Sequence, residues 1–100
     1  MLGFLQEHGP YVMEDEQSEF HLNDFSWNKE ANMLYIESPA GVGFSYCDSQ
    51  RYCQFNDETS AQDNLDALLL FYQKFPELRQ NDLYISGESY AGIYVPYLAY

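Results

Sequence analysis

A serine in a tight turn between two apolar segments constrains the fold of this chain more than any other feature. The sequence runs from the apolar residues 83–85 through GESYA, residues 87–91, and into a second apolar segment. Small residues two positions before and two positions after Ser89 allow a strand and a helix to pass close together. The stretch therefore predicts a strand, a sharp turn with Ser89 at its apex, and a helix.

The same turn indicates a chemical role for the serine. A nucleophilic serine needs a strained turn that lifts its hydroxyl above the edge of a sheet. A helix that begins behind Ser89 would bring partial positive charge and the backbone N–H of Tyr90 close to a developing oxyanion. The alternative is that Gly87 and Gly92 merely shape a connection between strand and helix, and the turn alone leaves both interpretations open.

Apolar patterns elsewhere predict alternating strands and helices. Residues 33–36 form a continuous apolar run, which is typical of a strand buried on both faces of a sheet. From Thr59 onward apolar residues recur at steps of three and four, Thr59 and Gln62 have the spacing of a capping box, and Pro76 ends the helix. This order predicts an α/β fold, with a mostly parallel sheet flanked by helices.

The first third of the chain has weaker signals. Short strands are expected at residues 11–13 and 20–22, with a polar loop at residues 14–19 between them. The large aromatic side chains are expected in the core rather than at a ligand. These residues are Trp27, Tyr35, Phe44, Tyr46, Phe71 and Tyr72.

Composition argues against several classes of partner. The chain is 46% hydrophobic, which is too apolar for a disordered segment. Sixteen acidic residues against four Lys and Arg give a formal net charge of −12, which argues against binding to nucleic acid or an anionic membrane surface.

No apolar run approaches the roughly 18 residues of a membrane span. We expect no metal and no cofactor, because two cysteines and remote histidines do not make a zinc site.

Cys47 and Cys53 are close enough in sequence to close a small loop. A disulfide between them would require an oxidising compartment. The alternative is two free thiols, because cysteine is often simply a small buried residue. The sequence leaves this pairing open.

The order of motifs resembles the serine carboxypeptidase family over nearly the whole chain. The matching segments are ESPAGVGFSY at residues 37–46, Asp63 in the helix, FPE at residues 75–77 and GESYAGIYVP at residues 87–96. The resemblance implies an α/β-hydrolase fold and removal of single residues from peptide C-termini, usually at acid pH. It also implies a lysosomal, vacuolar or secreted protein, which could form a homodimer when complete.

Site residues follow from the resemblance, position by position. Ser89 resembles the nucleophile that becomes acylated, and Ala91 replaces the second glycine of G-x-S-x-G. Glu88 resembles one half of a carboxylate pair that binds the substrate's terminal carboxylate, and Glu7 matches the other half. Tyr90 resembles an oxyanion-hole donor and a wall of the pocket for the residue before the cut. Two adjacent carboxyls can share a proton, so at low pH one can donate a hydrogen bond to the substrate.

The resemblance also implies residues that this sequence does not contain. In the α/β-hydrolase fold the triad acid and histidine follow the serine, whereas His8 and His21 both precede Ser89. We therefore expect residues 1–100 to be an internal piece of one domain, truncated at both ends and inactive by itself. Two alternatives stay open: an acyltransferase or esterase of the same family, and a non-catalytic remnant of a truncated gene.

Overall fold

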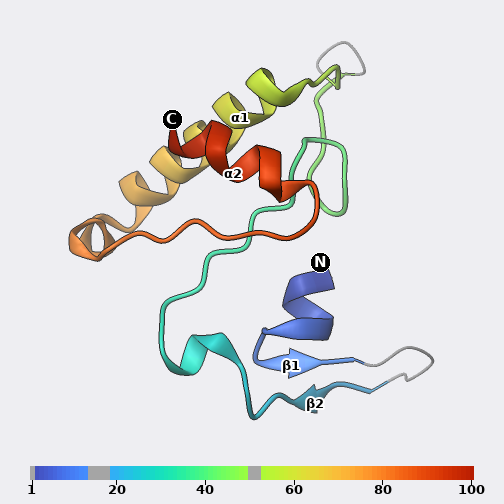
Figure 1. Ribbon diagram of the computed structural model, residues 1–100, viewed down its shortest axis with the longest axis vertical. Coiled ribbons are helices and arrows are strands. Elements are labelled where there is room, and N and C mark those ends of the chain that lie inside the picture. Colours follow the sequence, from blue (N-terminus) through green and yellow to red (C-terminus); the bar gives the residue numbers. More distant parts are fainter. Residues whose placement is uncertain (1, 14–18, 50–52) are drawn as a thin grey trace. The chain divides into compact units, whose positions relative to one another are not determined.

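The computed structural model of the chain describes residues 2–13, 19–49 and 53–100 (Figure 1). The polar loop predicted at residues 14–19 therefore lies almost wholly outside the described residues. Within the described ranges, no helix combines the length and the apolar character that crossing a membrane requires.

The chain divides into two compact units, Met1–Glu37 and Ser38–Tyr100. Among the described residues, the first unit contains the short strands β1 (Tyr11–Val12) and β2 (His21–Leu22) with the single-turn helices η1 (Gly3–Glu7) and η2 (Trp27–Lys29). The second contains the α-helices α1 (Asp57–Lys74) and α2 (Ala91–Ala99) and the short helix η4 (Pro76–Gln80). In the first unit β1 packs on η1 and on β2, and in the second unit α1 packs on α2 and on η4.

The first unit is built from a helical turn and a two-stranded sheet. The turn η1 (Gly3–Glu7) is a π-helix, and β1 (Tyr11–Val12) pairs antiparallel with β2 (His21–Leu22). Tyr11 lies opposite Leu22 in this register. The structure thus confirms both short strands, each one residue shorter than the sequence predicts. The 3-10 helix η2 (Trp27–Lys29) follows β2.

Helix α1 (Asp57–Lys74) begins two residues earlier than the sequence predicts, because Asn56 caps it. The Asn56 Oδ1 accepts the Thr59 N–H at 2.9 Å, and the Thr59 Oγ1 accepts the Asn56 N–H at 2.9 Å. This reciprocal pair is a capping box. The predicted box between Thr59 and Gln62 is therefore wrong, and Gln62 instead donates to Asp66 at 2.9 Å.

The end of α1 and the start of the last helix agree with the sequence. Lys74 is the final residue of α1, and Pro76 opens the 3-10 helix η4 (Pro76–Gln80). The chain then returns along the second unit without regular structure over residues 82–88, as Figure 1 shows in orange. It enters α2 (Ala91–Ala99), which packs on α1 in the most extensive contact between two elements of the described residues.

The strands predicted at residues 33–36 and 83–85 are not formed in the part of the chain that the structure describes. The β1–β2 pair is the single sheet among the described residues. A strand is held by hydrogen bonds to a neighbouring strand, and the described residues supply no such neighbour for either segment. The parallel sheet therefore stays a prediction.

The described residues form no hydrophobic core. Among the described residues, no aliphatic, aromatic, Met or Cys side chain is buried, and the buried side chains are those of Ser26, Pro39, Ser60 and Asn64. The prediction of an aromatic core is wrong for this part of the protein, since Trp27 is 50% exposed and Phe44 and Tyr46 are each 81% exposed. Tyr35, Phe71 and Tyr72 are only half-buried. The physical reason is that each unit has few elements. A helix or strand is covered only where it packs on a neighbour, and its other faces stay exposed to solvent.

Candidate active site

Ser89 lies in the sharp turn between residues 82–88 and α2. Its φ is +58°, the only positive φ among the described residues other than glycine. The left-handed region crowds the Cβ of an L-residue, and a non-glycine residue held there costs about 1–3 kcal/mol. The Ser89 side chain is exposed. The turn thus holds one exposed serine in a strained conformation.

Close approach of two small residues explains why this turn can form. A Cβ added at Gly87 would clash with the Cβ of Ala91, whereas a Cβ added at Gly92 would meet nothing within 4 Å. The turn is closed by the Ala91 N–H, which donates to the Glu88 carbonyl at 3.0 Å, and by the Gly92 N–H, which donates to Ser89 at 3.0 Å. Positions 87 and 91 must therefore carry small side chains, because the two residues lie in close contact. Position 92 has no such steric requirement.

Tyr90 is the N-cap of α2, and its side chain joins the turn to α1. The Tyr90 hydroxyl donates to Asp57 Oδ1 at 3.1 Å. The rings of Tyr90 and Tyr94 meet edge-on, with their centroids 4.9 Å apart. The hydrogen bond to Asp57, and then the negative charge of that carboxylate, raise the pKa of Tyr90. The first N–H groups of a helix have no partner within the helix. The Tyr90 backbone N–H thus belongs to the helix end where an oxyanion donor is expected.

The two glutamates of the expected carboxylate pair lie in different units. Glu88 is exposed and directly precedes Ser89. Glu7 is the last residue of η1 in the first unit. The pairing of Glu7 with Glu88 therefore stays a prediction.

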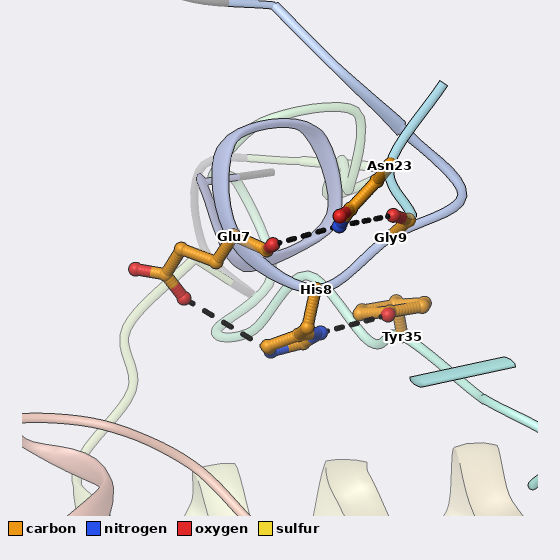
Figure 2. Close-up of polar contacts among 5 residues, drawn as sticks. All are labelled: Glu7, His8, Gly9, Asn23 and Tyr35. Atoms are coloured by element: carbon orange, nitrogen blue, oxygen red, sulfur yellow. Dashed lines mark hydrogen bonds and ion pairs between the residues drawn. The ribbon is translucent and has the colours of Figure 1, made fainter. Parts of the chain in front are cut away.

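The loop that follows Glu7 has a defined set of polar contacts (Figure 2). The Asn23 Nδ2 donates to the backbone carbonyls of Glu7 and Gly9, at 3.0 and 2.9 Å. The His8 Nδ1 lies 2.8 Å from the Tyr35 hydroxyl, and the His8 Nε2 lies 3.9 Å from the Glu7 carboxylate. These contacts tie the residue expected to bind substrate to a histidine and an asparagine.

His8 lies among aromatic rings. Its imidazole stacks on Trp27 with ring centroids 4.4 Å apart, and on Tyr35 with centroids 5.4 Å apart. Partial burial raises the pKa of Tyr35, so this phenol stays protonated at ordinary pH. Trp27 and Tyr35, which the sequence assigns to the core, instead hold His8 in place beside Glu7.

Cys47 and Cys53 form a disulfide with their Cα atoms 5.8 Å apart. The closed loop begins after the turn at Gly41, where an added Cβ would lie 3.7 Å from each sulfur. Residues 50–52 inside this loop lie outside the described residues. Among the residues that the structure describes, no three His, Cys, Asp or Glu side chains gather as metal ligands would.

Asn23 and Asp57 are the two site residues that the sequence does not indicate. Each acts on a partner that is distant along the chain: Asn23 on Glu7 and Gly9, and Asp57 on Tyr90. Asparagine and aspartate are ordinary loop and helix-start residues, so no local pattern separates them from others of their type.

The whole chain, residues 1–100, matches the model of the serine carboxypeptidase family. The chain therefore belongs to the serine carboxypeptidase family, and membership implies an α/β-hydrolase fold. It is 52% identical over 98 residues to serine carboxypeptidase-like 35 of Arabidopsis thaliana. It is 50% identical over 97 residues to the lysosomal protective protein of Mus musculus. These matches cover 97% of this chain but only 20% of each relative, so the chain spans about a fifth of their length.

Proposed function

We propose that the complete protein is a serine-type carboxypeptidase in which Ser89 is the nucleophile. The observation that carries this proposal is the positive φ of Ser89, +58°, at an exposed turn before a helix. Backbone strain of this kind concentrates at functional sites. Membership of the serine carboxypeptidase family supports assigning that strain to catalysis.

The proposed reaction has two steps. The Ser89 Oγ attacks the carbonyl carbon of the last peptide bond, and its proton passes through a base to the departing amine of the terminal residue. Water then hydrolyses the ester between Ser89 and the shortened peptide. The base would be a histidine located after Ser89 in the complete protein, because the fold orders the triad in this way. The Tyr90 N–H would stabilise the oxyanion.

Substrate selection would depend on a free C-terminal carboxylate. In this proposal Glu7 and Glu88 meet and share one proton, and the protonated member donates a hydrogen bond to that carboxylate. When the pH rises and the shared proton is lost, two negative carboxylates would face a third. Affinity for peptides should therefore fall with rising pH, while affinity for esters without a terminal carboxylate should not.

The disulfide supports a location in the secretory pathway. Disulfides persist in oxidising compartments, and Cys47 and Cys53 are paired here. One relative at 50% identity is named a lysosomal protective protein. We therefore place the complete protein in a lysosome or vacuole, or outside the cell.

Kinetics on the complete protein test this function. The expected result is release of the terminal residue from an N-blocked dipeptide, and a loss of kcat of at least about a thousandfold in Ser89→Ala. Transfer of the acyl group to an added alcohol in preference to water would instead indicate an acyltransferase. A wild-type protein with no turnover on either the peptide or an ester would contradict the proposal.

A further inference from the structure

We propose that Asn23 is a positioning residue that fixes the loop carrying Glu7 and thereby sets the affinity for the substrate's terminal carboxylate. This inference rests on the proposed role of Glu7. Asn23 does not contact substrate in this account, and it acts through the backbone on which Glu7 is carried.

The side chain of Asn23 bridges two carbonyls of that loop. Its Nδ2 donates to the carbonyl oxygens of Glu7 and Gly9, at 3.0 and 2.9 Å (Figure 2). Its Oδ1 accepts the Phe25 N–H at 3.0 Å, which fixes which end of the amide faces the loop. Only an amide can accept at one end and donate two hydrogen bonds at the other.

Backbone hydrogen bonds complete the attachment. The Asn23 N–H donates to the Pro10 carbonyl at 3.0 Å, and the Trp27 N–H donates to the His8 carbonyl at 3.0 Å. Together with the side chain, these bonds give each of the four consecutive carbonyls of residues 7–10 a donor from residues 23–27. A loop with all its carbonyls held in this way has little freedom to shift.

Packing defines a narrow native position for this loop, which the donors of Asn23 help to hold. Gly9 is buried, and a Cβ added there would clash with the backbone carbonyl of Phe4 in η1. The ring of His8 is held by the stack on Trp27 and by Tyr35, and its Nε2 lies 3.9 Å from the Glu7 carboxylate. Removing the donors of Asn23 should therefore displace the Glu7 backbone, and a misplaced carboxylate binds its ligand less tightly.

Two substitutions separate the donors from the rest of Asn23. Asn23→Asp keeps the shape but places an oxygen opposite two carbonyl oxygens. Asn23→Ser loses the two Nδ2 donors, and the single O–H of the shorter serine cannot bridge both carbonyls. The serine oxygen can still accept the Phe25 N–H, so the local turn is preserved. The matched control is Asn28→Asp, which adds the same charge at an exposed position of η2.

The test compares two substrates in the complete protein: an N-blocked dipeptide with a free terminal carboxylate, and an N-blocked amino acid ethyl ester without one. We expect both Asn23 variants to raise KM for the dipeptide about tenfold, since two hydrogen bonds of ordinary strength are lost. We expect kcat for the dipeptide and both constants for the ester to change less than about twofold. Asn28→Asp should match the wild type on both substrates.

A double substitution tests whether Asn23 acts through Glu7. Adding Asn23→Ser to Glu7→Gln should raise KM no further, because residues in one coupled unit are not additive. Additive effects would overturn the inference, as would an equal loss on ester and dipeptide, an unchanged dipeptide KM, or failure of both Asn23 variants to fold. Ser89→Ala measured in parallel keeps the two proposals apart: full activity in that variant contradicts the function itself, whatever Asn23 does.

Discussion

The hydroxyl of Tyr90 donates a hydrogen bond to the carboxylate of Asp57, at 3.1 Å, and this bond joins the residue after the proposed nucleophile to the first turn of α1. The two residues are 33 positions apart in sequence. The conformation of the turn at Ser89 is therefore supported from outside, by a helix whose start is fixed by its own capping box at Asn56.

Loss of the Asp57 carboxylate should loosen the Tyr90 side chain without unfolding α1. We expect Asp57→Ala in the complete protein to lower kcat/KM for a blocked dipeptide by about three- to tenfold, because Tyr90, the proposed wall of the substrate pocket, becomes mobile. Glu58→Ala is the matched control, since it also removes an acid from the first turn of α1. Equal effects of the two variants would show that the helix dipole, and not the bond to Tyr90, is responsible.

The same hydrogen bond predicts a change at alkaline pH. The pKa of Tyr90 is raised above 10.0, first by the hydrogen bond to Asp57 and then by the charge of the Asp57 carboxylate, with smaller contributions from desolvation and from Tyr94 and Tyr97. A raised pKa in the folded state means that the bond contributes stability fully below about pH 10, and that this contribution is lost as the pH rises through the pKa of Tyr90. NMR titration of ring-labelled tyrosine should show the Tyr90 pKa falling in Asp57→Asn. An unchanged titration would contradict the assigned cause.

Two glycines near Ser89 should respond in opposite ways to the same substitution. Gly87→Ala introduces a clash with Ala91, so we expect loss of activity and a lower Tm. Gly92→Ala meets no atom within 4 Å and lies inside α2, so stability should hold or rise by up to about 1 kcal/mol. Thermal unfolding and dipeptide hydrolysis of the two variants make the comparison. A damaging Gly92→Ala would contradict the steric explanation of the turn.

The capping box gives a prediction for stability alone. Asn56→Ala removes the acceptor of the Thr59 N–H and should destabilise the complete protein by about 1 kcal/mol. Gln62→Ala should cost less, because the hydrogen bond of Gln62 to Asp66 lies on the exposed surface of α1. Urea unfolding of both variants decides between the two caps. A larger loss of unfolding free energy for Gln62→Ala than for Asn56→Ala would indicate that Thr59 and Gln62 form the capping box after all.

Features encoded by neighbouring residues were the ones that the sequence could predict. Helix α1 follows from the apolar repeat before Pro76, and its first residue is misplaced because Asn56 and Thr59 are both good caps. The start of α2 just after Ser89 follows from the local turn pattern, because the close pair of Gly87 and Ala91 is only four residues apart.

Features that need a distant partner could not be predicted in this way. The apolar runs at residues 33–36 and 83–85 show that a segment favours burial, but not that a neighbouring strand is present to pair with it. The contact of Asn23 with Glu7 spans 16 positions, and that of Tyr90 with Asp57 spans 33, with no repeat or motif linking the partners. Hydrophobicity likewise marks Phe44 and Tyr46 for a core that the described residues do not provide.

Covalent labelling of Ser89 tests the central claim most directly. The complete protein would be treated with a sulfonyl fluoride, which sulfonylates nucleophilic serines, and then digested and analysed by mass spectrometry. We predict one adduct per protein, located on Ser89, with loss of peptide hydrolysis in proportion to labelling. Inactivation with the adduct on another residue, or continued hydrolysis by protein fully labelled at Ser89, would contradict the account.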